Sequence, residues 1–178
     1  MPERTFGGVA FELAALALLV HVAGAVLWAG GAVFFVFMVY PAVRDAGPAG
    51  GAVMQAVLRR GGFGRFFGPI STLTVAAGLY MYVDGDFHRA AFDGAANSAL
   101  TLGMLLGLVA WLVALLVLMP NEAKLKALVK TLPAQGPPPP EAMARFQALA
   151  MKQGKASLVS ATLLLVALAL MAGRGLLA

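Results

Sequence analysis

Four long runs of apolar residues, separated by short polar segments, dominate the pattern along this 178-residue chain. The runs lie at about residues 10–43, 66–83, 98–119 and 157–177. Each reaches or approaches the ~20 apolar residues that a helix needs to cross a bilayer. The pattern predicts an all-α fold, a bundle of four transmembrane helices forming one integral membrane domain over residues 1–178. The first run exceeds the ~7–15-residue core of a removable signal peptide, so we expect it to be retained.

Composition supports a membrane class and excludes several kinds of site. The chain is 61% hydrophobic and only 12% charged, whereas a soluble domain carries about 25% charged residues. It has no cysteine, which excludes disulfides, thiolate metal sites, iron–sulfur clusters and covalently attached haem. No aromatic residues alternate with the basic ones as in a stacking surface, so we expect no nucleic acid partner.

The positive charges predict an orientation. Three of the thirteen basic residues, Arg4, Arg89 and Arg174, flank one end of the predicted spans. The other ten lie in the loops after the first and third runs; they are Arg44, Arg59, Arg60, Arg65, Lys124, Lys126, Lys130, Arg145, Lys152 and Lys155. Cytoplasmic loops carry the excess of Lys and Arg. We therefore expect both of these loops in the cytoplasm and both termini outside.

The long loop between the third and fourth runs has structure of its own. Apolar residues recur at helical spacing around Leu125 and again around Phe146, with lysines beside the first set. This pattern predicts interfacial helical segments that lie along the membrane surface. The proline-rich stretch 136–140 between them predicts a stiff hinge.

His21 is the candidate for chemistry because a titratable side chain at membrane depth is costly. It shares one helical face with Ala17, Gly24, Trp28, Gly31 and Phe35, since these positions recur in alternating steps of four and three. Small residues on such a face allow another helix to approach closely. This face is therefore expected to point at protein or at a cofactor.

Three roles for His21 remain open: an interhelical hydrogen-bonded clasp, a haem or copper ligand, and a proton relay. Helix rise places His21 roughly 16 Å from the outer end of its span and Met104 roughly 9 Å from the end of its own. Met171 lies about one and a half to two turns from the outer end of the fourth span. An imidazole with one or two thioethers suits haem or copper(I). The candidate cofactor-binding residues are thus His21, Met104, Met171 and Trp28, with His21 as the metal ligand.

The first two spans resemble a known family. His21-x6-Trp28-x-Gly30-Gly31, followed by Phe34-Phe35 and Pro41, is similar to the first helix of the copper resistance protein D superfamily. The segment Arg65-Phe66-Phe67-Gly68-Pro69, followed by Gly78-Leu79-Tyr80, resembles the second helix of these proteins. That superfamily includes four-helix protoporphyrinogen-oxidase-type proteins and related uncharacterised families of bacterial membranes.

The resemblance implies a bundle in the bacterial inner membrane whose first-helix histidine holds haem b or copper. Residues 98–119 lack the lysine that the haem-synthesis branch carries in its third helix, so it implies no particular enzyme activity. We expect a membrane protein of electron transfer or metal handling. The alternative is a non-catalytic accessory subunit of a larger membrane complex. Its expected partners are the lipid bilayer and either further copies of the chain or the other subunits of such a complex.

The orientation predicts which residues an impermeant reagent reaches. A single cysteine introduced as Gln135→Cys should be labelled only after the cytoplasmic face is opened, because the basic loop that holds it is expected to stay inside. The native chain has no cysteine, so wild type is the matched blank. Labelling of Gln135→Cys in intact cells would contradict the orientation.

Overall fold

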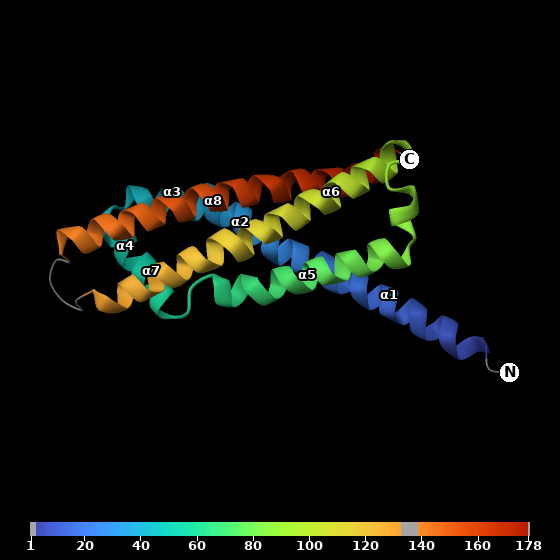
Figure 1. The fold of residues 1–178 in the computed structure, drawn as a ribbon, viewed down its shortest axis with the longest axis horizontal. Coiled ribbons are helices and arrows are strands. Elements are labelled where there is room, and N and C mark those ends of the chain that lie inside the picture. The colour runs from blue at the N-terminus through green and yellow to red at the C-terminus, as the bar shows by residue number, and fades with distance from the viewer. Residues whose placement is uncertain (1–2, 133–138, 178) are drawn as a thin grey trace.

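The structure is a computed structural model that describes residues 3–132 and 139–177, with side chains from Glu12 onward. All of its regular elements are helical, and four of its helices are long and apolar enough to cross a membrane: Glu12–Asp45, Gly64–Asp84, Gly94–Thr131 and Pro140–Leu176. These bounds confirm the predicted all-α class and the four spans. The chain therefore has the architecture of a multi-pass membrane protein (Figure 1).

The first and third long helices contain π-helical turns. The first consists of α1 (Glu3–Ala25), η1 (Val26–Gly30), α2 (Gly31–Phe34), η2 (Phe35–Val39) and α3 (Tyr40–Asp45), with π geometry in η1 and η2. The third consists of α6 (Gly94–Val113), the π turn η4 (Ala114–Leu118) and α7 (Met119–Thr131). The remaining elements are α4 (Pro48–Arg59), α5 (Gly64–Asp84), the 3₁₀ turn η3 (Phe87–Ala90), α8 (Pro140–Gly173) and the 3₁₀ turn η5 (Arg174–Leu176).

The long helices pack as two antiparallel pairs. α1 lies along α5, and α6 lies along α8 (Figure 1). The pairs join near the middle of the molecule, where Trp28, Ala29, Ala110 and Leu164 form a buried cluster. Toward its first residues α1 leans away from the other helices (Figure 1). Large apolar side chains such as those of Leu13, Leu16 and Leu19 are exposed there, as on a lipid-facing helix.

Glycines bring the paired helices together. A Cβ at Gly24 would overlap the side chain of Thr74, and one at Gly31 would lie 2.8 Å from the Phe67 ring. The prediction that this face of the first span meets another helix is thus confirmed. In the second pair, a Cβ at Gly103 would lie 2.8 Å from Met171. Both pairs depend on missing Cβ atoms, which is how small residues allow close packing in lipid.

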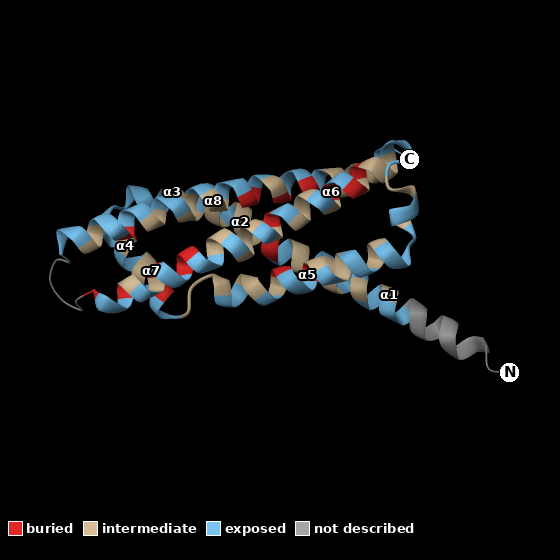
Figure 2. Ribbon diagram, in the orientation of Figure 1, coloured by how far each residue is buried: buried red, intermediate tan, exposed pale blue. Residues whose placement is uncertain are grey.

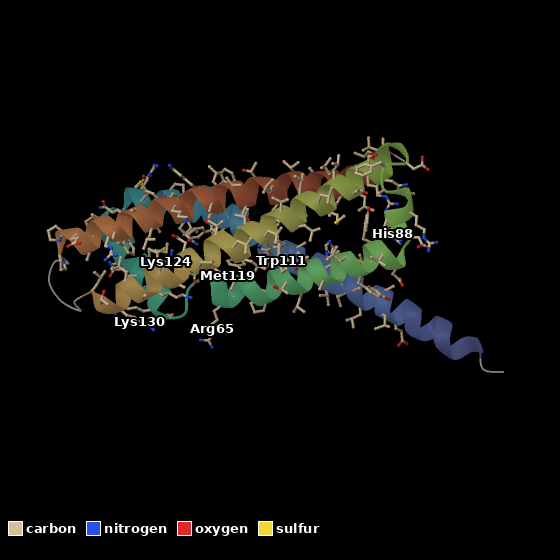
Figure 3. The ribbon with its side chains drawn as sticks, in the orientation of Figure 1. Arg65, His88, Trp111, Met119, Lys124 and Lys130 are labelled. Atoms are coloured by element: carbon tan, nitrogen blue, oxygen red, sulfur yellow. The ribbon has the colours of Figure 1, made fainter. Side chains whose placement is uncertain are left out.

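The end of the molecule opposite the termini carries the ten loop cations counted above, and we call it the basic end. Figure 3 shows Arg65, Lys124 and Lys130 in this half of the molecule and His88 at the other end. Helix α4 and the segments beyond the spans pack here around Leu58, Leu125, Val129, Leu132 and Phe146. The first residues of α1 and the turn η5 both lie at the opposite end of the molecule (Figure 1), as an even number of spans requires.

The expected interfacial segments are in fact continuations of the spans. Helix runs without a break from Gly94 to Thr131, and α8 begins at Pro140 and not near Ser157. A segment coaxial with a span cannot lie in the membrane plane. The buried cluster at the basic end explains the difference, because it uses the apolar residues assigned to the lipid surface. Most of the predicted hinge at 136–140 lies outside the described residues.

Burial is sparse elsewhere. Figure 2 shows buried positions as short patches along α6, α7 and α8 and near the middle of α5, with exposed residues over much of the ribbon. Since there is no hydrophobic driving force between helices in lipid, packing at such patches carries the association.

The α1–α5 contact predicts a difference between neighbouring glycines. Gly24→Leu and Gly31→Leu should each lower the free energy of unfolding by about 1–3 kcal/mol, because the added side chain overpacks the contact. Gly30→Leu is the control, since a Cβ there meets no atom within 4 Å. Thermal unfolding in detergent measures the effect. Equal unfolding temperatures for all three variants would contradict the proposed contact between α1 and α5.

Candidate functional site

His21 sits between α1 and α5 and is held by the backbone of α5. Its Nδ1 lies 2.8 Å from the carbonyl oxygen of Thr74. The ring lies against Gly78, where a Cβ would be only 2.7 Å from Cε1 of the imidazole. The hydroxyl of Thr74 donates to the carbonyl of Ile70 over 2.7 Å. A glycine one turn after Thr74 thus gives the imidazole access to a helix carbonyl.

This contact determines the tautomer of His21. A carbonyl oxygen only accepts hydrogen bonds, so Nδ1 carries the proton and donates it. In a neutral imidazole the lone pair is then at Nε2. The arrangement can accept a hydrogen bond or a proton at Nε2, or coordinate a metal ion there.

The other predicted ligands lie elsewhere. Met171 packs against Gly103 in the α6–α8 pair, and Met104 is half-buried beside it on α6. The contacts of His21 given above lie on α5, and neither thioether takes part in them. A site combining them stays a prediction. Over the described part of the chain, no three His, Cys, Asp or Glu side chains lie close enough to hold a metal ion.

Trp28 shares the helical face of His21 but not its surroundings. It is buried in the cluster between the two helix pairs, and it lines a cavity of about 820 Å³ that His21 does not reach. The cavity extends from Trp28 to the basic end, with Leu58 of α4 and Phe146 of α8 in its wall. Sequence reasoning missed it, because its wall combines residues from every long helix.

Sequence reasoning also missed Glu122, which is only 4% exposed. Its two carboxylate oxygens accept hydrogen bonds from the backbone N–H of Gly64, over 3.1 and 2.9 Å, at the first turn of α5. Lys126 Nζ lies 2.6 Å from Oε1. The helix N-terminus and the ammonium together compensate the buried charge. The available signal was a single acidic residue four positions before a lysine in a basic segment.

The glycine turn before α5 makes room for this carboxylate. Gly61 and Gly62 have φ of 119° and 67°, a region that L side chains rarely adopt. A Cβ at Gly62 would also overlap the side chain of Glu122. The glycine turn therefore leaves the space that the Glu122 carboxylate occupies at the start of α5.

Asn121 extends this polar region toward α8. Its amide nitrogen donates to the carbonyl of Leu149 over 2.9 Å and to Oε1 of Gln153 over 2.8 Å. Its Oδ1 is buried and has no partner among the described residues. The buried amide therefore retains an unused acceptor beside Gln153, which lines the cavity.

No protein-family model, curated protein or solved structure matches the chain.

The Glu122 contact predicts a stability difference between two glutamates. Glu122→Gln should lower the free energy of unfolding by about 1–3 kcal/mol, because it removes the charge that Lys126 pairs with and one of the acceptors of the α5 terminus. Glu141→Gln is the control, since Glu141 is exposed in the first turn of α8. Thermal unfolding in detergent compares the two, and equal midpoints would show that Glu122 does not anchor α5.

Proposed function

We propose that the protein is a small integral membrane protein that binds haem b or copper through His21, in electron transfer or metal handling. The observation that carries the proposal is the hydrogen bond from Nδ1 of His21 to the carbonyl of Thr74. Metal-ligating histidines almost always donate their other ring N–H to a carbonyl, carboxylate or water. Such a bond orients the ring and leaves Nε2 as the ligating atom.

The donor set fits haem b better than copper. His21 has one oriented imidazole, and no cluster of ionisable ligands surrounds it in the described chain. A single axial imidazole suffices for a haem iron, as in globins, whereas copper needs further ligands. When bound, haem would supply one-electron iron chemistry. The protein would contribute an oriented Nε2 and an apolar, water-poor surrounding on α1 and α5.

The second ligand has two proposed sources. One is a thioether of Met104 or Met171, which would raise the reduction potential. The other is His21 of a second copy of the chain. The exposed apolar side chains of α1 near His21 support the second source.

We further propose that the basic end faces the cytoplasm of a bacterial cell, so that His21 lies toward the outer leaflet. The ten-to-three distribution of Lys and Arg supports this orientation. The exposed apolar helices suit the bilayer as the surrounding medium.

The accessory-subunit alternative rests on the same hydrogen bond. A neutral imidazole donating to Thr74 already ties α1 to α5, and polar side chains between membrane helices serve this purpose. The exposed apolar face of α1 would then pack against another subunit. The two proposals differ in what occupies Nε2.

An absorption spectrum separates them. Protein expressed with haem and copper supplied should show a Soret band or bound copper, and His21→Ala should lose it. His88→Ala is the control, because His88 is exposed in the turn after α5. Loss of the His21–Thr74 bond should cost only about 0.6 kcal/mol, a typical value for an interhelical bond in membranes. The His21→Ala bundle should therefore remain folded.

Two further variants test the geometry. Gly78→Ala places a Cβ against the ring, so it should shift the spectrum by moving the imidazole off Thr74. Met104→Leu and Met171→Leu should shift the reduction potential if a thioether is the second ligand. A folded wild type with neither haem nor copper would overturn the cofactor proposal and favour the accessory subunit.

A further inference from the structure

The cavity at the basic end has the size and lining of a binding site for a small molecule. Its volume of about 820 Å³ falls in the usual range of ligand pockets, roughly 300–1,000 Å³. It has aromatic walls from Trp28, Phe35 and Phe67 on the side toward the middle of the molecule. Toward the basic end it has hydrogen-bonding groups from Tyr40, Gln153 and other polar residues, which are Gln55, Gln147, Ser157 and Ser160.

The π-helical turns coincide with this cavity. All three that the described residues form contribute to its wall: η1 through Trp28, η2 through Phe35, and η4 through Leu118. Such turns are rare and occur often at functional sites. Their coincidence along one cavity supports a functional role for it.

The charges around the cavity are already paired. Arg44 lies 3.1 Å from Asp45, and Glu122 is held by Gly64 and Lys126. No other Asp, Glu, Lys or Arg of the described chain lines the wall. The buried part of the wall therefore offers an ionic ligand no free counter-charge, since Arg44 is 71% exposed, and this favours a neutral ligand.

Hydrogen-bonding groups are available for a neutral headgroup. Gln153 accepts from Asn121 through Oε1, so its amide NH₂ remains to donate. The hydroxyl of Tyr40 lies beside Gly154, the residue that follows Gln153 in α8. A Cβ at Gly154 would be only 2.7 Å from the hydroxyl oxygen. The absent Cβ leaves room for this hydroxyl against α8, and Tyr40 and Gln153 both line the cavity.

We propose that the cavity binds one molecule of a neutral amphiphilic lipid. Its chain or ring packs against Trp28, Phe35 and Phe67, and its hydroxyl or carbonyl headgroup meets Tyr40 and Gln153. This site is separate from His21 and does not depend on a cofactor there.

Trp28 can report occupancy directly. The chain has two tryptophans, and the second, Trp111, donates to Thr72 at the α5–α6 contact. Trp111→Phe thus leaves Trp28 as the only indole, and Trp28→Phe leaves Trp111 as the reference. The probe is a monoacylglycerol brominated in its chain, titrated into nanodiscs that hold the full-length protein. Bromine quenches an indole that it contacts.

A glycine pair supplies the matched test of the site. Gly51 lines the cavity, and a Cβ there meets no atom within 4 Å. Gly51→Leu should fill the space without overpacking the fold, and it gains helix propensity. Gly107→Leu, in α6, is the control, because Gly107 also has open space but does not line the cavity.

We expect the probe to quench Trp28 in a saturable way. Gly51→Leu should lower the apparent affinity of the probe about tenfold or more, because the new side chain and the probe compete for the same volume. Gly107→Leu should leave the quenching of Trp28 unchanged. Quenching of Trp111, which does not line the cavity, should rise with probe without saturating. Non-saturable quenching of Trp28, or equal quenching in the Gly51→Leu variant, would overturn the proposal. Stronger quenching by the matching brominated fatty acid anion would overturn the assignment of a neutral headgroup.

Discussion

The basic end of the molecule depends on the carboxylate of Glu122. This group accepts a hydrogen bond from the backbone N–H of Gly64, the first residue of α5, and pairs with Lys126. It therefore joins the start of the second span to the continuation of the third. Removing either compensating group would leave a buried charge unpaired, which is far costlier than an exposed one. Because α5 begins at this point, the anchor also sets where α5 lies along α1, and with it which residue of α5 meets His21.

The sequence predicted the four spans and the glycine face of the first one, because length, hydropathy and helical spacing are local properties. It could not predict the continuation of the third helix through Thr131. Apolar residues such as Leu125 and Val129 suit a lipid surface and a buried cluster equally well, and only the positions of Leu58 and Phe146 decide between them. The cavity and Glu122 were missed for the same reason, since their partners lie far apart in the sequence.

His21 shows how one contact can serve two hypotheses. The sequence identified the residue from its depth, and the structure adds a partner, Thr74, and a tautomer. That bond stabilises the α1–α5 pair whether or not Nε2 has a ligand. Met104 and Met171 were chosen by depth alone, and depth gives only the position along the membrane normal. Two residues at matching depth can still belong to different helix pairs, as Met171 does through Gly103.

The unequal lengths of the spans have a consequence for the surrounding membrane. α5 has 21 residues, about 32 Å of helix, close to the ~30 Å thickness of the hydrocarbon layer. The third helix has 38 residues, about 57 Å. Hydrophobic matching is therefore constrained most tightly by α5, since the longer helices exceed the thickness of this layer. A thicker bilayer would draw Arg65 and the α5 terminus toward lipid and strain the Glu122 anchor, so the stability of this protein should follow the thickness of its membrane.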